Sequence, residues 1–227
     1  MDATLDLTPH GSIYVECVTN GPVETNTYFV SSLDECVVID PASDGERLVA
    51  DYLAQHPRVS VKGVVCTHAH GDHIGGVAGM RAALGRDLPF CITREDAEFI
   101  PQAVESMRSM WGIRTPDPGA PSRLLEEGDV VEFGNAHLQV LLTPGHTPGG
   151  AVLFASCENG LFAFVGDTLF PGSHGRTDLV GGDEPTILDS LAKMARVLPS
   201  ETLCLVGHGR ATTMGEETLS NPFLQGA

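Results

Sequence analysis

Four side chains that can bind a metal ion lie within six consecutive residues, as His68, His70, Asp72 and His73. Imidazole nitrogens and carboxylate oxygens are ligands that first-row divalent cations accept. Side chains of an extended segment repeat every two residues, so His68 and His70 are expected to point in the same direction. Asp72 and His73 follow where the chain turns, and we expect them to face a point beside the first pair. The motif therefore predicts two adjacent cation sites.

The second half of the chain supplies three further candidate ligands, each at the end of a predicted strand. His146, Asp167 and His208 each come after an apolar run and directly after a glycine. Open α/β sheets bring ligands together at the carboxyl ends of their strands. We therefore expect these three side chains to meet the cluster at residues 68–73.

The seven candidate ligands can be divided between two cations. The first cation would be held by three imidazoles, those of His68, His70 and His146. The second would be held by a carboxylate and two imidazoles, those of Asp72, His73 and His208. Asp167 is expected to bridge the two cations, because a carboxylate has two oxygens. Cations in such pairs lie ~3.5–4 Å apart. The predicted site is locally cationic within an acidic chain, which suits an oxyanion.

The predicted elements alternate strands with helices. β-Branched and aromatic runs between turn residues predict strands at 12–19, 26–32, 35–40, 61–66, 89–92, 130–133, 136–143, 151–156, 161–166 and 201–206. Helical patterns cover 43–55, 77–84, 94–111 and 184–197, and Ser43 is the expected cap of the first of these. The tail at 215–227 predicts no element.

An apolar stripe runs along the predicted helix at 94–111. Ile100, Val104, Met107 and Trp111 recur at spacings of four, three and four residues, which favours a packed helix face. The alternative interpretation makes this helix part of a flap over the site, with Met107, Met110 or Trp111 touching the substrate.

Composition limits the classes of function. The 227 residues carry a formal charge of −17, which repels a phosphate backbone and argues against nucleic-acid binding. No apolar run approaches the ~18 residues of a membrane helix, and the first residues lack the pattern of a secretory signal. Six scattered cysteines contain no Cys-x-x-Cys pair and are expected to be reduced thiols. We expect a single cytoplasmic domain spanning residues 1–227.

These segments together resemble the metallo-β-lactamase superfamily, and within it the glyoxalase II-like hydrolases. The resembling motifs are Asn26-Thr27-Tyr28, Asp40-Pro41, Thr67–His73, Gly128-Asp129, Thr143–Gly149, Gly166–Phe170 and Gly207-His208-Gly209. The resemblance implies an α/β fold, an αββα sandwich of two mixed β-sheets between helical layers with the metals at one edge. It also supports the ligand assignment given above.

The segment Gly172–Leu179 and the later Asn221–Leu224 resemble the short bacterial branch of these hydrolases. Two interpretations of Arg176 stay open: it anchors a loop through Asp178, or it contacts a substrate carboxylate. His174 is a candidate to line the mouth of the site. Glyoxalase II proper has an additional C-terminal helical domain that helps to bind glutathione, and this chain ends soon after His208.

The resemblance and the ligand count predict a binuclear metal-dependent hydrolase that cleaves a small thioester such as a hydroxyacylglutathione. A metal-bound water becomes hydroxide near neutral pH and attacks the acyl carbonyl. Asp72 and Asp167 are the candidate catalytic carboxylates. Zinc is the expected metal, with iron and manganese as alternatives.

Two other functions remain open at this point. The Gly175-Arg176-Thr177-Asp178 segment also resembles persulfide dioxygenases, which share the fold and use a single iron held at positions such as His68, His146 and Asp167. A non-catalytic metal-binding module that keeps the fold is the second alternative.

Overall fold

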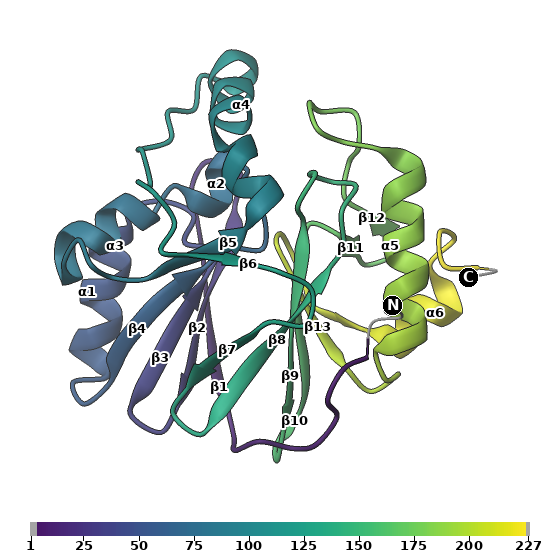
Figure 1. Ribbon diagram of the computed structural model, residues 1–227, viewed down its shortest axis with the longest axis horizontal. Helices are drawn as coiled ribbons and strands as arrows, with labels where there is room; N and C mark the ends of the chain where they lie inside the picture. The colour runs from purple at the N-terminus through teal and green to yellow at the C-terminus, as the bar shows by residue number, and fades with distance from the viewer. Residues whose placement is uncertain (1–3, 226–227) are drawn as a thin grey trace.

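Two six-stranded β-sheets face each other at the centre of the molecule, and helices cover the outer face of each (Figure 1). The computed structural model describes residues 4–225. The four layers are the αββα sandwich that the sequence predicts, so the predicted fold class is confirmed.

The first sheet has the order β1-β2-β3-β4-β5-β6. Its strands are Tyr14–Asn20, Thr25–Ser32, Glu35–Ile39, Ser60–Val65, Phe90–Thr93 and Arg123–Leu125. β1, β2 and β3 pair antiparallel, whereas β3 to β6 run parallel to one another. The carboxyl ends of β3, β4 and β5 therefore meet at one edge of the sheet.

The second sheet has the order β14-β13-β10-β9-β8-β7. In that order its strands are Thr212–Thr213, Leu203–Val206, Gly160–Gly166, Ala151–Cys157, Ala136–Leu142 and Val130–Phe133. β10 and β13 are parallel neighbours, so both end at the same edge. A small hairpin of β11 (Leu169–Phe170) and β12 (Ser173–His174) follows β10.

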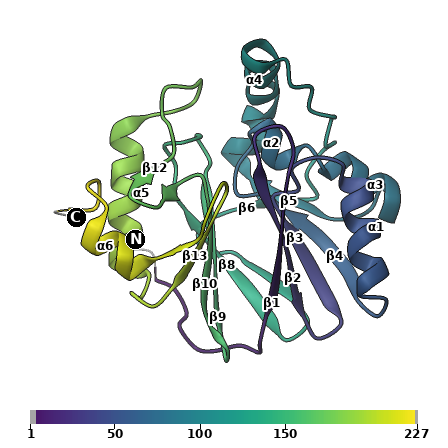
Figure 2. The same ribbon diagram turned by 180° about the vertical axis from the view of Figure 1, so that it is seen from behind.

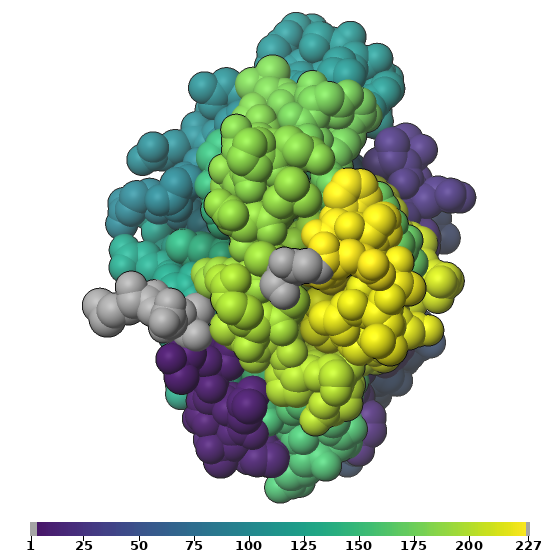
Figure 3. Space-filling model, turned by 90° about the vertical axis from the view of Figure 1, so that its right-hand side faces the viewer, coloured from purple at the N-terminus to yellow at the C-terminus, as the bar shows by residue number. Residues whose placement is uncertain are grey.

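The helices divide between the two outer faces. α1 (Gly45–Gln55), α2 (Gly71–Ile74), α3 (Val77–Leu84) and α4 (Arg94–Trp111) lie on the side of the first sheet (Figure 2). α5 (Glu184–Val197) and α6 (Met214–Ser220) pack on the second sheet, and this part of the chain lies in the middle of the face seen in Figure 3. None of the helices within residues 4–225 has the length and apolar character needed to cross a bilayer.

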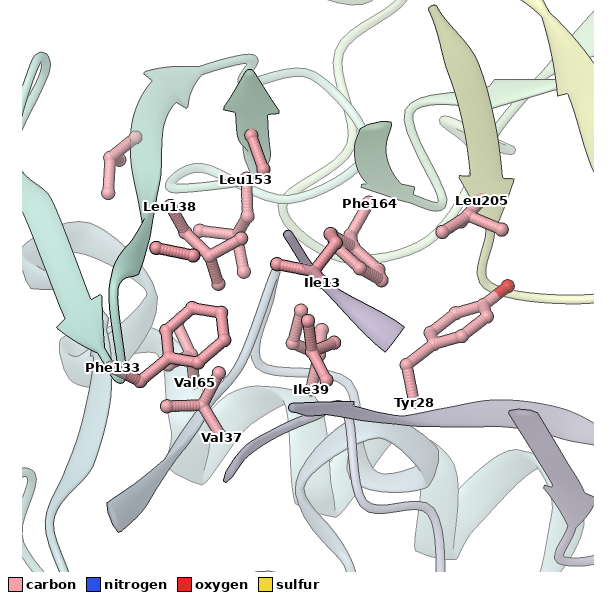
Figure 4. Packing of buried hydrophobic residues seen from close by; sticks show 14 of the residues in the cluster. Ile13, Tyr28, Val37, Ile39, Val65, Phe133, Leu138, Leu153, Phe164 and Leu205 are labelled. Atoms are coloured by element: carbon pink, nitrogen blue, oxygen red, sulfur yellow. The ribbon is translucent and has the colours of Figure 1, made fainter. Parts of the chain in front are cut away.

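The core between the sheets is apolar and closely packed (Figure 4). The first sheet contributes residues such as Val37, Ile39 and Val65, which face Leu138 and Phe164 of the second sheet. Burial of each such side chain is worth ~1.5–3 kcal/mol. This core holds the strand ends of both sheets in fixed relative positions, which is what a site shared between the sheets requires.

The longer predicted elements agree with the structure, and the differences have local causes. The helix predicted from Ser43 begins at Gly45, with Asp44 as its N-cap in a left-handed conformation. Gly45 lies against Gly76, where a side chain would collide with the Gly76 carbonyl oxygen, and this contact fixes the start of the helix.

The elements that the sequence analysis missed are α2, α6, β6, β11, β12 and β14. Most of them have two to four residues, too few to show a hydrophobic period. α6 did carry a signal: Thr213 caps it by accepting a hydrogen bond from the Glu216 backbone, a Thr-x-x-Glu capping pattern.

Candidate metal centre

The seven predicted ligands lie at one edge of the sandwich and come from both sheets. Those at residues 68–73 follow β4 of the first sheet, whereas the others follow β8, β10 and β13 of the second. Sheet packing therefore joins the two halves of the cluster.

The first group of ligands consists of His68, His70 and His146. Their ligand atoms all lie within 4.8 Å of one another, and all three side chains are buried. His70 Nδ1 is 2.9 Å from His146 Nε2. This spacing suits three nitrogens around a single cation.

The second group consists of Asp72, His73 and His208, whose ligand atoms also lie within 4.8 Å of one another. Asp72 Oδ2 is 3.3 Å from His73 Nε2 and 3.4 Å from His208 Nε2. The two histidine nitrogens are 3.4 Å apart. These two groups have the composition that the sequence analysis predicts. The described residues also contain a third buried group that could hold a cation, Asp40, His68 and His73, which takes one ligand from each of the other two.

Asp167 lies between the two groups. Its Oδ1 is 3.5 Å from His73 Nε2, in the second group. Its Oδ2 is 3.5 Å from both His146 Nε2 and His208 Nε2, so it faces both groups. A carboxylate in this position can contact a cation on either side.

The chemistry of the donor set fits bound cations. Within the part of the chain that the structure describes, His68 Nε2 and Asp167 Oδ1 are buried and form no hydrogen bond. A buried polar atom without a partner costs ~1–3 kcal/mol, and a cation at this position would remove that cost. His/Asp groups of this type are metal-binding clusters.

The ionisation of the first ligand group and of Asp167 suits metal binding. Burial lowers the pKa of His70 to about 3 and that of His68 well below its usual value, which keeps both imidazoles neutral. Burial opposes ionisation of Asp167, but His73 and the neighbouring histidines outweigh it and lower the pKa of Asp167 to about 2. Neutral imidazoles and an ionised carboxylate are the forms that bind metals.

His73 and His208 differ from these ligands in their ionisation. Burial opposes their protonation, but the Asp72 and Asp167 carboxylates outweigh it and raise the pKa of His73 well above its usual value and that of His208 to about 10. A bound cation would therefore have to displace these protons.

Hydrogen bonds orient the ligand rings. His146 Nδ1–H donates to the Arg176 carbonyl at 2.7 Å, and His208 Nδ1–H donates to the Val23 carbonyl at 3.0 Å. Each bond leaves Nε2 of the ring facing the cluster. Such partners fix the tautomer and raise the basicity of the ligand nitrogen. Both acceptors are backbone atoms, so their residue types carry no signal in the sequence.

Asp40 is a positioning residue that the sequence analysis did not include in the site. Its carboxylate accepts hydrogen bonds from the Thr67 backbone at 2.7 Å, the Thr67 hydroxyl at 2.6 Å and His73 Nδ1–H at 2.9 Å. Asp40 thus aligns His73 and the start of the ligand loop. Thr25 plays a similar part, because its hydroxyl donates to Asp72 Oδ2 at 2.8 Å.

Asp96, in the first turn of α4, is a second positioning residue that the sequence analysis missed. Its fully buried carboxylate accepts hydrogen bonds from the Ala69 backbone at 2.8 Å, the Thr147 hydroxyl at 2.8 Å and the Gly149 backbone at 2.6 Å. It thereby joins the loops that carry the first group of ligands. Burial raises the pKa of Asp96 to about 6. An aspartate at a helix start normally indicates a surface residue, which explains the omission.

Residues 20–208 match the family model of the metallo-beta-lactamase superfamily. The chain belongs to this superfamily. Among curated relatives, the probable metallo-hydrolase YqgX of Bacillus subtilis (strain 168) is 34% identical over 208 residues, which cover 91% of this chain and 95% of the relative. The hydroxyacylglutathione hydrolase GloC of Haemophilus influenzae is 31% identical over 188 residues, 82% of this chain and 86% of the relative. A glyoxalase II homologue is thus among the relatives.

Solved structures of the superfamily have the same architecture. TTHA1623 in a di-iron-bound form has a TM-score of 0.80 and 40% identity, over 92% of this chain and 100% of the other. BLEG-1, a B3 metallo-beta-lactamase, has a TM-score of 0.84 and 31% identity, over 94% of this chain and 100% of the BLEG-1 chain. ETHE1 from Myxococcus xanthus has a TM-score of 0.74 and 25% identity, over 92% of this chain and 83% of the ETHE1 chain.

In this member of the superfamily, a cavity of about 380 Å³ opens onto the metal cluster. Five candidate ligands form its base. Its other lining residues are Val23, Met107, Trp111, Phe170, Arg176 and Leu179.

The structure supports the packed-face interpretation of the stripe on α4 and places two of its residues at the cavity, whereas contact with a substrate stays a prediction. Ile100 and Val104 pack against the core under α4. Met107 and Trp111, near the carboxyl end of the same helix, line the cavity, whereas Met110 lies outside it. α4 thus combines a packed face with one wall of the site, and it rises above the sheets in Figure 1.

The two candidate substrate-contacting residues lie in different places. Arg176 lines the cavity but forms two hydrogen bonds, of 2.7 and 2.8 Å, with the Asp178 carboxylate. This geometry supports its anchoring role. His174 does not line the cavity. Its ring packs edge-on against Phe223, with 4.3 Å between the ring centres, and its Nε2 lies 3.3 Å from Oε1 of Glu184. The structure therefore brings the seven ligands and Arg176 to the site, but not His174.

Proposed function

We propose that this metallo-hydrolase superfamily member hydrolyses a small thioester with the help of two divalent cations. The observation that carries the proposal is the position of Asp167 between the two groups of ligands. Its Oδ1 lies 3.5 Å from Nε2 of His73, and its Oδ2 lies 3.5 Å from Nε2 of both His146 and His208. The 31% identity to a hydroxyacylglutathione hydrolase supports a thioester as the substrate.

The residues of the chain have separable tasks. His68, His70 and His146 would hold one cation, Asp72, His73 and His208 the other, and Asp167 both. Bound cations supply a Lewis acid and lower the pKa of water towards neutrality. The buried Asp72 carboxylate is held in place by the Thr25 hydroxyl, which would orient it towards the second cation. In the net reaction water adds to the acyl carbon, the C–S bond breaks, and the thiol leaves with a proton.

Zinc is the metal we propose, because three imidazoles around one cation suit it. Mixed imidazole and carboxylate sites also accept iron or manganese, and the di-iron form of TTHA1623 supports iron as an alternative. Metal quantification on protein purified without added metal distinguishes these cations.

The test is the Asp167→Ala variant. Because one carboxylate would serve both cations, we expect metal content to fall and thioester turnover to drop on the order of a hundredfold or more. Asp51→Ala is the matched control, because Asp51 is an exposed carboxylate on α1. Metal content and turnover in Asp167→Ala that equal those of the control would refute the proposal.

A persulfide dioxygenase is the second candidate, because the segment Gly175-Arg176-Thr177-Asp178 resembles those enzymes. A single iron and oxygen consumption with glutathione persulfide would favour this reaction. Two cations per chain and thioester cleavage without oxygen consumption would favour the hydrolase. Both measurements can be made on one protein preparation.

A further inference from the structure

Apart from the candidate metal ligands and Arg176, the residues that line the cavity are apolar. Met107 and Trp111 lie four residues apart on α4 and so share one face of the helix. Val23 from the β1–β2 turn, Phe170 of β11 and Leu179 from the loop before α5 complete the lining. Trp111 keeps 45% of its surface exposed. Apolar surface around a cavity favours an apolar ligand group, because binding removes that surface from water.

Apart from the candidate metal ligands and the cations they would hold, the cavity offers no unpaired cationic side chain within residues 4–225 for an anionic carrier. Arg176 is the single arginine or lysine among the described residues that line it, and its guanidinium is already paired with the Asp178 carboxylate. The guanidinium also lies 5.8 Å from the centre of the Trp111 ring, which keeps it against the wall. Glutathione is anionic at neutral pH, and the chain as a whole carries a charge of −17.

From these two observations we infer that the cavity selects an apolar acyl group carried on an uncharged thiol, in preference to a glutathione thioester. Met107, Trp111 and Leu179 are then specificity-determining residues. The inference rests on the proposed thioester hydrolysis, but the binding preference can be measured without any turnover.

Trp111 is the sole tryptophan of the chain, so its fluorescence reports on the cavity directly. The metal-loaded protein is titrated with two thioethers that cannot be hydrolysed, S-hexyl-N-acetylcysteamine and S-hexylglutathione. They share the alkyl group and differ in the charge of the carrier. We expect the neutral thioether to bind at least tenfold more tightly. From S-ethyl to S-hexyl, each added methylene is expected to lower Kd by about two- to fourfold.

Two matched pairs of variants test the lining. Leu179→Ala is expected to weaken hexyl thioether binding several-fold, whereas Val180→Ala, at an exposed neighbour outside the lining, leaves it unchanged. On α4, Met107→Ala is likewise expected to weaken hexyl thioether binding, whereas Met110→Ala, outside the lining, leaves it unchanged. Asp178→Ala removes the carboxylate that pairs with the Arg176 guanidinium and is expected to tighten S-hexylglutathione binding about three- to tenfold at low salt, with no effect on the neutral thioether.

The outcomes separate the two proposals. Glutathione thioethers that bind as tightly as the neutral ones, or an affinity that does not depend on alkyl length, would overturn the inference even if thioesters are hydrolysed. Neutral thioethers that bind as expected to a protein that cleaves no thioester would leave the inference standing and refute the proposed function.

Discussion

At the scale of single residues, the metal centre depends on small contacts beside the ligands. Gly207 precedes His208 and passes against Asp167, where an added Cβ would collide with Asp167 Oδ1 and lie 2.8 Å from His73 Cε1. Gly209, on the other side of His208, has a φ of +78° and open space around it. The two glycines are therefore needed for different reasons, close approach in one case and backbone conformation in the other.

Gly207→Ala is expected to lower metal affinity at least tenfold, because the new methyl group displaces Asp167. Gly209→Ala should strain the backbone by about 1 kcal/mol and leave metal affinity nearly unchanged. Metal content after dialysis against a weak chelator measures the first effect, and thermal unfolding measures the second. Equal metal losses in the two variants would contradict the role assigned to close packing at Gly207.

Thr25 permits a sharper test of ligand positioning. Thr25→Val keeps the shape of the side chain but removes the hydroxyl that donates to Asp72 Oδ2, whereas Thr25→Ser keeps the hydroxyl. We expect Thr25→Val to weaken binding of the second cation about tenfold and Thr25→Ser to stay near the parent protein. Stepwise metal titration monitored by calorimetry distinguishes the two cations. Weaker binding of the second cation in Thr25→Ser, with parent-like binding in Thr25→Val, would contradict the role of this hydrogen bond.

At the scale of elements, α4 links the fold to the site through its two ends. Its first turn holds Asp96, which binds the loops of the first ligand group, and its last two turns carry Met107 and Trp111 into the cavity. One helix therefore fixes ligand geometry and the shape of the cavity together.

Asp96 makes stability depend on pH in a defined direction. Burial raises the pKa of this carboxyl from 3.8 to about 6 in the folded chain, so folding favours its protonated form. Its contribution to the free energy of unfolding is complete below pH ~4 and is lost as the pH rises through 6, a change on the order of 3 kcal/mol.

The Asp96→Asn variant removes this titration and leaves the other ionisable groups in place. The difference in the free energy of unfolding, parent minus variant, is expected to fall between pH 4 and pH 7. Urea unfolding in the presence of a chelator measures this difference. A difference that stays constant over this range would show that Asp96 does not titrate with a raised pKa.

At the scale of the whole molecule, the metal centre joins the two sheets. The ligands at residues 68–73 belong to the first sheet, and His146, Asp167 and His208 belong to the second. A cation held by both groups of ligands binds only where the sheets are packed together, so metal binding stabilises the assembled sandwich.

Removal of the metals with a chelator is therefore expected to lower the melting temperature. A cation present at a hundred times its dissociation constant stabilises the fold by ~2.7 kcal/mol, which corresponds to roughly 5–10 °C for a chain of this length. Asp167→Ala serves as the control, because the chelator should shift its melting temperature much less. If the chelator lowers the melting temperature of both proteins equally, the stabilisation does not come from the predicted metal centre.

The sequence by itself predicted the seven candidate ligands, which the structure brings together, and determined the order of the longer elements. An imidazole or carboxylate at the end of an apolar strand is a local feature, and the hydrophobic periods of α4 and α5 are local as well, so both can be read from neighbouring residues.

Only the tertiary structure decided what surrounds the ligands. Asp96 and Asp40 contact ligand loops 27 and more residues away in the sequence, and His174 faces Phe223 rather than the cavity that its neighbour Arg176 lines. These contacts depend on how the two sheets and α4 pack. Packing brings together residues that are far apart in the sequence, and no periodicity or motif in the sequence links them. The chemistry of each side chain is local, whereas the set of partners that it meets is a property of the whole fold.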